Sequence, residues 1–175
     1  MKEVYVIRHG EKDNDGVLTK NGEKCAKELG SILPKFTRII SSDSSRTKLT
    51  ALLATGSEPT TDDRAGFFMS AQEKSDAINQ LASEKGISFF DAVDLFNDGE
   101  ILDAVQSKAI GLNELIDETL VSLREDEAAL IVSHDLTITP AMALRGLPKV
   151  SVPYLCGYVV TDSASVSAFY PNSVS

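Results

Sequence analysis

The chain has 175 residues, of which 42% are hydrophobic and 25% are charged, as is typical of one globular domain with a buried core. Its 17 Lys and Arg residues are outnumbered by 26 Asp and Glu residues, which leaves a formal net charge of −9. Because an acidic surface repels polyanions, we expect no nucleic acid and no anionic membrane as a main partner, whereas a small phosphorylated molecule could still bind in a local positive pocket.

The first predicted element is a strand at Glu3–Arg8. Its apolar run, residues 4–7, is continuous, as in a strand that is buried on both faces of a parallel sheet. The run is too short for a signal peptide or a membrane span, so we expect a cytoplasmic protein. His9 and Gly10 follow at the carboxyl end of this strand.

The next predicted element is a helix that follows Leu18. Thr19 is its predicted N-cap, and Pro34 helps to end it. Five residues at helical spacing form its predicted buried stripe: Cys25, Ala26, Leu29, Ile32 and Leu33. Cys25 and Cys156 are far apart and belong to no CxxC pair, so we expect two reduced cysteines and no disulfide.

The middle of the chain is predicted to be mostly helical. Its elements are, in order, a strand at residues 37–40, a polar turn at 41–45, a helix at 46–54, a loop or strand end at 56–63, and helices at 71–85, 87–96 and 100–124. Its aromatic residues either line a substrate pocket or pack in the core: Phe67, Phe68, Phe89, Phe90 and Phe96. We interpret residues 62–117 as a small helical cap within a single domain of residues 1–175.

A third predicted strand, at residues 127–133, is apolar and ends at His134. A short helix at residues 139–144 follows, and strands at 157–161 and 166–170 close the chain around a turn at 162–165. Because strands and helices alternate, we predict an α/β fold. This fold is a three-layer sandwich, with a mostly parallel central sheet and helices on both of its faces.

Both histidines of the chain lie where a predicted strand ends. His9 follows the first strand and His134 a later one, so in a parallel sheet both imidazoles emerge at the edge where such folds bind ligands. Arg8 lies beside His9, and Arg46 lies at the start of a helix that follows another strand end. Guanidinium groups and helix N-termini bind phosphate oxygens, and neutral imidazole is a nucleophile. These residues together indicate a site for a phosphoryl group.

Four motifs in chain order resemble those of the histidine phosphatase superfamily, which includes phosphoglycerate mutase-like and acid phosphatase-like proteins. They are Arg8-His9-Gly10-Glu11, Leu18-Thr19 with Gly22 and Ala26, the Ser-Ser-Asp-Ser-Ser-Arg run at residues 41–46 with Thr50-Ala51, and Ser133-His134-Asp135. A single short motif recurs by chance, whereas four motifs in order that use both histidines are specific. The resemblance covers residues 3–56 and 127–170.

The resemblance implies a metal-independent phosphomonoesterase that needs no cofactor. His9 would carry the phosphoryl group, and Arg8, Arg46 and His134 would hold its oxygens. His134 would then have to donate hydrogen bonds and be at least partly protonated. Three neighbours of the nucleophile are further candidates for substrate binding: Gly10, Glu11 and Lys12. No metal site is expected, since two histidines and distant cysteines match no known ligand spacing.

A general acid must protonate the leaving oxygen, and the resemblance offers two places for it. In one branch of the family the acid is the Asp directly after the second histidine, which is Asp135 here. In the other branch it is a Glu of the middle region, where Asp62, Asp63 and Glu73 are the available substitutes. We favour Asp135, which could also serve as the N-cap of the helix that follows it.

Three functions remain open at this point. The first is hydrolysis of a phosphorylated small molecule or phosphoprotein, the second is a mutase reaction, and the third is phosphate binding without catalysis. The short middle region predicts an open cap, which favours hydrolysis by a monomer or homodimer. Catalytic silence would follow if Asp43, in the altered loop at residues 41–47, pointed into the pocket and repelled phosphate.

Overall fold

The structure, a computed structural model, describes residues 1–68, 72–162 and 164–171. In this described part, six strands form one sheet in the order β3-β2-β4-β1-β5-β6. The strands are β1 Glu3–Arg8, β2 Arg38–Ser41, β3 Thr60–Thr61, β4 Ala128–Ser133, β5 Gly157–Thr161 and β6 Val166–Phe169. The first four are parallel to one another, whereas β5 pairs antiparallel with β1 and forms a hairpin with β6. The predicted mostly parallel central sheet is confirmed.

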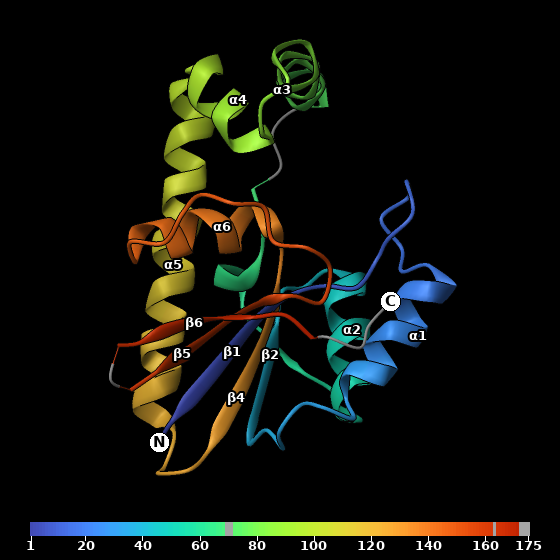
Figure 1. Ribbon diagram of the computed structural model, residues 1–175, viewed down its shortest axis with the longest axis vertical. Helices are drawn as coiled ribbons and strands as arrows, with labels where there is room; N and C mark the ends of the chain where they lie inside the picture. Colours follow the sequence, from blue (N-terminus) through green and yellow to red (C-terminus); the bar gives the residue numbers. More distant parts are fainter. Residues whose placement is uncertain (69–71, 163, 172–175) are drawn as a thin grey trace.

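Helices cover both faces of this sheet (Figure 1). On one face lie α1 (Lys20–Leu29) and α2 (Ser45–Thr55), and on the other lie α5 (Gly99–Ser122) and α6 (Asp135–Leu144). The side chains of β4 pack into the apolar core on both faces of the sheet. Leu130 and Val132 pack toward α1 and α2, whereas Ala129 and Ile131 pack toward α5 and α6. Such alternation is expected of a strand buried on both faces, and it confirms the predicted three-layer sandwich.

Two further helices lie beyond the carboxyl edge of the sheet (Figure 1). They are α3 (Gln72–Lys85) and α4 (Phe89–Phe96), which follow the 3-10 helix η1 (Asp63–Ala65). Together with the start of α5 they bury an apolar cluster of their own, centred on Ile78, Ala92, Val93 and Ile101. These helices fall in the region interpreted as a cap. Ala71, the first residue of the helix predicted at residues 71–85, lies outside the described residues.

Two helix ends differ from the predictions. The first helix ends at Leu29, so Ile32 of the predicted stripe lies after it and is 47% exposed. The last helix begins at Asp135 rather than at residue 139, and its N-cap position is occupied by His134 rather than by Asp135. Its β-branched residues and Pro140 have low helix propensity. Burial of residues 137–142 against the rest of the molecule outweighs that propensity.

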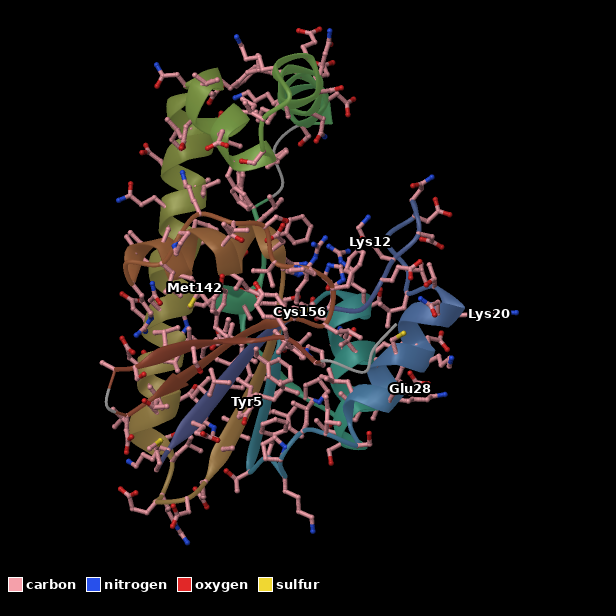
Figure 2. The ribbon with its side chains drawn as sticks, in the orientation of Figure 1. Tyr5, Lys12, Lys20, Glu28, Met142 and Cys156 are labelled. Carbon is pink, nitrogen blue, oxygen red and sulfur yellow. The ribbon has the colours of Figure 1, made fainter. Side chains whose placement is uncertain are left out.

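The two cysteines are free thiols, as predicted. Cys25 is buried on α1. Cys156 is half-buried just before β5 (Figure 2). In the described part of the chain, no helix combines the length and the apolar character that crossing a membrane requires.

Candidate active site

Parallel pairing of β1 with β4 brings the two histidines together. Arg8 pairs with Ser133 in the register of these strands, so His9 and His134 each follow the last pair of two neighbouring strands. The backbone N–H of His9 donates to the Ser133 carbonyl at 3.1 Å. The two imidazole rings lie 5.2 Å apart, centroid to centroid, and each histidine is 3% exposed. Both imidazoles therefore lie, almost fully buried, at the carboxyl edge of the sheet.

Arg46, in the first turn of α2, joins the two rings. Its Nε donates to His9 Nε2 at 3.1 Å, and its terminal NH2 group lies 3.2 Å from His134 Nδ1. Since a guanidinium group can only donate, both of these imidazole nitrogens must accept. The protons are then on the opposite nitrogens, so His9 Nδ1 donates to the Gly10 carbonyl at 2.8 Å and His134 Nε2 donates to Ser42 Oγ at 2.9 Å.

The surroundings of both histidines favour the neutral imidazole. Burial lowers the pKa of His9 to about 4, with smaller contributions from Arg46, Arg8 and Lys12, while the hydrogen bond to Gly10 acts in the opposite direction. Burial also lowers the pKa of His134 to about 2, with smaller contributions from His9, Arg46 and Arg8. Both rings are therefore neutral at pH 7 in the free site. The partial protonation expected of His134 would require a bound anion.

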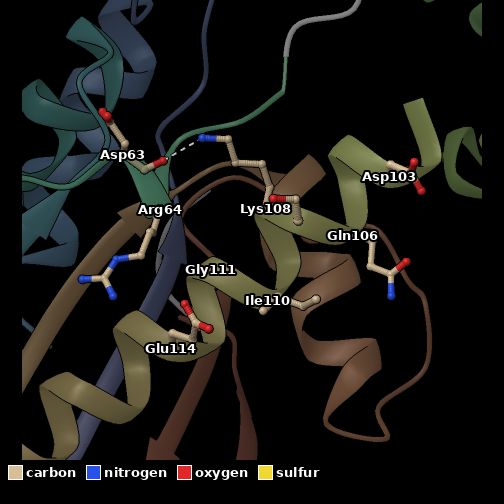
Figure 3. A pocket seen from close by; sticks show the side chains of 9 residues that line it. Asp63, Arg64, Asp103, Gln106, Lys108, Ile110, Gly111 and Glu114 are labelled. Atoms are coloured by element: carbon tan, nitrogen blue, oxygen red, sulfur yellow. Dashed lines mark hydrogen bonds between the residues drawn. The ribbon is translucent and has the colours of Figure 1, made fainter. Parts of the chain in front are cut away.

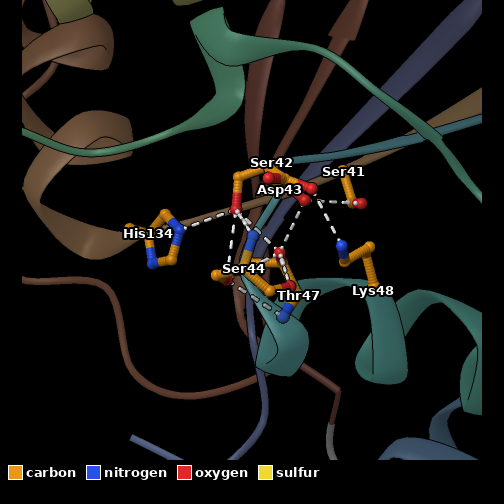
Figure 4. A network of polar contacts seen from close by, with 7 residues as sticks. All are labelled: Ser41, Ser42, Asp43, Ser44, Thr47, Lys48 and His134. Atoms are coloured by element: carbon orange, nitrogen blue, oxygen red, sulfur yellow. Dashed lines mark hydrogen bonds and ion pairs between the residues drawn. The ribbon is translucent and has the colours of Figure 1, made fainter.

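A network of hydroxyl groups orients the ring of His134 through its Nε2, the nitrogen opposite the one that faces Arg46 (Figure 4). Ser42, which follows β2, lies with its Oγ 2.7 Å from the Oγ1 of Thr47 and 3.2 Å from the Oγ of Ser44. Ser44 is the N-cap of α2. The same network thus orients the His134 imidazole and starts the helix that carries Arg46.

Asp43 does not point into the site. Its carboxylate pairs with Lys48 at 2.8 Å, and its side chain is 78% exposed. The ammonium of Lys48 holds the pKa of Asp43 below its usual value. The altered loop at residues 41–47 therefore places no negative charge in the path of a phosphate, and the ground for expecting a silent site is removed.

Arg8 and Asp135 hold the segment that leads to β5. Arg8 NH1 donates to the Val152 carbonyl at 2.7 Å and lies 3.8 Å from Asp135 Oδ2. The other carboxylate oxygen, Oδ1, accepts from the Val152 N–H at 2.8 Å and from Thr139 Oγ1 at 2.7 Å, while the Ser151 hydroxyl donates to Oδ2. Nε of Arg8 is buried and has no hydrogen-bond partner among the described residues, so this guanidinium retains donor capacity for a ligand or a water molecule.

These side chains surround a cavity of about 200 Å³. Its lining residues are Arg8, His9, Lys12, Arg46, Phe67, His134, Asp135 and Leu136, and Figure 2 shows Lys12 on the loop after β1. Gly10 and Glu11 do not line it. The Gly10 N–H donates to Thr50 Oγ1 at 3.0 Å, and the Glu11 carboxylate accepts from the Asn21 amide at 2.8 Å. Both residues thus connect the loop after β1 to neighbouring helices.

The other candidate acids lie elsewhere. Asp62 is paired with Arg64 at 2.9 Å, which lowers the pKa of Asp62, and Glu73 is exposed on α3. Asp63 borders a larger groove of about 620 Å³ between η1 and α5, where Lys108 donates to the Asp63 carbonyl (Figure 3). That groove contains no histidine, so size alone does not mark the site of chemistry. Among the four candidates only Asp135 lines the histidine cavity.

Three contributors to the site have no role in the sequence-based predictions. Ser42 and Thr50 belong to the motif around Arg46, which gave a weak signal for them. Tyr154 packs on the Arg8 guanidinium, with its ring centroid 4.1 Å from Arg8 Cζ. It belongs to an irregular segment, and nothing in the local pattern marked it. The described residues contain no group of three or more His, Cys, Asp or Glu side chains that could hold a metal ion.

Comparison with known proteins finds a matching family model and solved structures of similar fold. The model of the histidine phosphatase superfamily (branch 1) matches residues 4–169. No curated protein matches the chain in sequence.

Solved structures share the fold at low sequence identity. "Bacillus stearothermophilus YhfR" is 23% identical with a TM-score of 0.68, and the match covers 96% of this chain and 95% of that one. Phosphoglycerate mutase from Bacillus anthracis is 19% identical with a TM-score of 0.66, covering 98% and 93%. Phosphoserine phosphatase from Entamoeba histolytica, in complex with 3-phosphoglyceric acid, is 19% identical with a TM-score of 0.67, covering 99% of both chains.

Proposed function

Since the chain belongs to the histidine phosphatase superfamily, we propose that it is a metal-independent phosphomonoesterase with His9 as its nucleophile. The observation that carries this proposal is the convergence of two neutral imidazoles on one guanidinium. His9 Nε2 and His134 Nδ1 each direct a lone pair toward Arg46, at one cavity. The substrate is a phosphorylated small molecule or a phosphoprotein, and the reaction uses no cofactor.

In the first step, the lone pair on His9 Nε2 attacks phosphorus, and the bond from phosphorus to the leaving oxygen breaks. The phosphoryl group enters where Arg46 meets the two rings, so Arg46 exchanges two neutral acceptors for charged oxygens. Arg8 and Arg46 offset the charge on those oxygens. The hydrogen bond from His9 Nδ1 to the Gly10 carbonyl keeps Nε2 directed at the cavity. It also stabilises the positive charge that the ring gains.

His134 needs a proton on Nδ1 before it can donate to a phosphoryl oxygen. The second pKa of a phosphomonoester is about 6, so the monoanion can deliver that proton as it binds. The Nε2–H of His134 keeps its hydrogen bond to Ser42 throughout. Proton uptake at His134 thus accompanies binding of the substrate and is not a property of the free site.

Asp135 is the proposed general acid. Its Oδ1 accepts a hydrogen bond from the Val152 backbone N–H. Because a backbone N–H can only donate, Oδ1 must remain an acceptor and cannot carry the proton. Its Oδ2 faces the Ser151 hydroxyl, which can rotate and accept instead. The catalytic proton therefore belongs on Oδ2, from which it passes to the leaving oxygen.

In the second step, a water molecule attacks phosphorus and Asp135 takes a proton from it. The bond between His9 Nε2 and phosphorus breaks, and the lone pair returns to Nε2. Inorganic phosphate leaves, and Asp135 carries a proton again for the next cycle. Two guanidinium groups and a protonated imidazole provide the positive charge of the site in both steps.

The region at residues 62–117 acts as a cap in this proposal. Phe67 precedes α3 and lines the cavity, so the cap contributes directly to the wall of the site. A cap of this size leaves the cavity open to solvent, which favours transfer of the phosphoryl group to water over its return to a rebound product. We further propose that the enzyme works in the cytoplasm as a monomer or homodimer.

The proposal is tested by hydrolysis of p-nitrophenyl phosphate between about pH 4 and pH 8. The variants are His9→Ala and Asp135→Asn, with Asp43→Asn as an exposed control that does not line the cavity. We expect no activity in His9→Ala, and activity about 10²- to 10⁴-fold lower in Asp135→Asn with an alkyl phosphate as substrate. The loss in Asp135→Asn should be smaller with p-nitrophenyl phosphate, whose leaving group needs less protonation.

Two results would contradict the proposal. Phosphate binding without any turnover by the wild type would indicate a silent phosphate-binding module. Full activity of Asp135→Asn toward alkyl phosphates would remove Asp135 from the acid role while leaving His9 as nucleophile. An acid-labile, base-stable phosphoprotein that forms in the wild type and not in His9→Ala would identify the intermediate directly.

A further inference from the structure

An aromatic ring borders the histidine pair on the side of His134. The Phe67 ring lies 4.5 Å from the His134 ring, centroid to centroid, and its centroid is 5.1 Å from Arg46 Cζ. Phe67 also lines the cavity. A leaving group attached to a phosphoryl held by His134 and Arg46 would therefore be next to this ring.

A second aromatic ring borders the pair on the side of His9. The Tyr154 ring lies 5.7 Å from the His9 ring, and Arg8 Cζ lies 4.1 Å from its centroid. Tyr154 is 37% exposed, and its hydroxyl makes no hydrogen bond within the described part of the chain. Part of the ring is thus free to contact a ligand.

The wall between the site and the cap is apolar as well. Leu136 lines the histidine cavity and also a second cavity of about 40 Å³ inside the cap. That second cavity is lined mainly by apolar side chains of the cap and α5: Phe68, Ile78, Phe89, Val93, Ile101 and Val105. A leaving group that extends from the phosphoryl group toward the cap therefore contacts Phe67 and Leu136 before it reaches any charged side chain.

Little positive charge remains for a second anionic group on the substrate. Arg8 and Arg46 are turned toward the histidines, the Val152 carbonyl and Asp135. Lys12 is the other cation of the cavity lining, and its exposed ammonium donates to a backbone carbonyl at 3.3 Å. An exposed cation of this kind contributes little to binding a carboxylate.

From these contacts we propose that the site selects phosphomonoesters whose leaving alcohol carries an aromatic ring close to the ester oxygen. The specificity-determining residues are Phe67, which lines the cavity beside His134, and Tyr154, which lies outside the cavity lining beside His9. Each offers an aromatic contact on its own side of the histidine pair. This inference rests on the proposed phosphatase function. Contact between aromatic rings at centroid distances of 4.5 to 7 Å corresponds to a gain of about two- to tenfold in kcat/KM.

The test compares benzyl phosphate with cyclohexylmethyl phosphate. Both release a primary alcohol of similar size and basicity, so the two substrates differ mainly in the aromatic character of the ring. We expect wild-type kcat/KM to be about fivefold higher for benzyl phosphate. Tyr154→Leu and Phe67→Leu should each lower this ratio, and the double variant should bring it close to one.

Two further variants separate the ring from other effects. Tyr154→Phe retains the ring and should retain the ratio. Tyr170→Leu removes a tyrosine that is 55% exposed near the end of the chain, and it should also leave the ratio unchanged. Because each result is a ratio within one variant, a general loss of activity does not alter the conclusion.

The possible outcomes are distinct. A wild-type ratio near one, or a ratio that survives in the double variant, overturns the aromatic preference while the phosphatase function stands. Loss of the ratio in Tyr154→Phe assigns the effect to the hydroxyl and overturns the ring contact. If the wild type hydrolyses p-nitrophenyl phosphate but neither ester, this inference fails while the phosphatase function stands. If it hydrolyses none of the three substrates, the proposed function fails, and this inference fails with it.

Discussion

A guanidinium group can only donate hydrogen bonds, and this property lets Arg46 determine the tautomers of both histidines. Its Nε and NH2 groups donate hydrogen bonds to His9 Nε2 and His134 Nδ1 at the same time. The opposite nitrogens then carry the protons and bond to Gly10 and Ser42. The lone pair of the proposed nucleophile, His9, is consequently directed into the cavity before any substrate arrives, which is preorganisation of the kind that lowers a reaction barrier.

We predict that Arg46→Lys reduces kcat/KM for p-nitrophenyl phosphate by about 10²- to 10³-fold. An ammonium is a single point charge and cannot reproduce the two-pronged contact of a guanidinium. The measurement is steady-state hydrolysis, with urea unfolding to verify that the fold is intact. Arg38→Lys, at an arginine outside the cavity lining, is the matched control and should retain wild-type activity. Equal activity of Arg46→Lys and wild type would show that the two-pronged contact of the guanidinium is unimportant for catalysis.

We also predict that inorganic phosphate inhibits more strongly as the pH falls. In the free site His134 is neutral, because its pKa is lowered to about 2. A bound phosphate needs a donor at Nδ1, so the complex holds one proton more than the free protein and the phosphate dianion. By linkage, affinity then increases as pH falls through the phosphate pKa, by up to about tenfold per pH unit, and is lost as pH rises.

The measurement is the inhibition constant of phosphate between about pH 6 and pH 8. Calorimetry in buffers with different ionisation enthalpies counts the protons taken up. His134→Gln, whose amide can donate without protonation, should show less proton uptake. Inhibition that is independent of pH in the wild type would contradict the proposed role of His134.

Among individual residues, the sequence identifies those whose types are chemically distinctive. Two histidines at strand ends and an arginine at a helix start were sufficient to predict His9, His134 and Arg46 as neighbours. Ser42 and Tyr154 were missed, because their importance comes from contacts across the fold. A serine in a polar turn and an exposed tyrosine in an irregular segment have no local pattern that distinguishes them from ordinary surface residues.

Among the helices and strands, α1 comes unusually close to the loop after β1. A Cβ built on Gly22 would lie 2.3 Å from the Glu11 carbonyl oxygen, which is too close for any contact with backbone. Thr19 caps the same turn by accepting from the Gly22 N–H at 2.9 Å. The helix start and the loop that follows His9 therefore form one packed unit.

We predict that Gly22→Ala destabilises the fold by about 1–3 kcal/mol, although alanine is intrinsically the better helix former. The added methyl group must displace the Glu11 backbone, two residues from the proposed nucleophile His9, so kcat/KM should fall as well. Gly99→Ala is the matched control, since it also lies in the first turn of a helix and its Cβ would meet nothing within 4 Å. That variant should be neutral or slightly more stable in urea unfolding. A neutral Gly22→Ala would contradict the close approach.

Elements with strong periodicity or long apolar runs were predicted well, including β1 at Glu3–Arg8. The start of α6 was missed, because its first residues have low helix propensity and only their burial makes them helical. The strand order was not predicted either, since β4 pairs with both β1 and β2 through contacts that are remote in sequence. Periodicity reports which face of an element is buried and not which element covers it.

In the part of the chain that the structure describes, a large apolar core has one half on each face of the sheet, and a smaller core is separate from it. The larger surrounds the sheet, whereas the smaller lies among α3, α4 and the start of α5, beyond the carboxyl edge of the sheet (Figure 1). Lys149 pairs with Asp94 at 2.6 Å and links the segment before β5 to α4. An exposed ion pair of this kind adds little stability. The smaller core is therefore expected to open locally at a lower free energy than the sheet.

This expectation leads to a prediction about two substitutions of similar size. Ile78 is 1% exposed in the smaller core, and Leu112 is fully buried in the larger one. Each change to alanine removes buried methyl groups and lowers the stability of the core that contains it by about 2–5 kcal/mol. Ile78→Ala should accelerate amide hydrogen exchange in α3 and α4 while β4 keeps its protection, because the sheet does not depend on the smaller core. Leu112→Ala should lower protection in both regions, since α5 passes through each. If Ile78→Ala reduced protection in β4 as much as in α4, the molecule would be a single cooperative unit and the smaller core would not open independently.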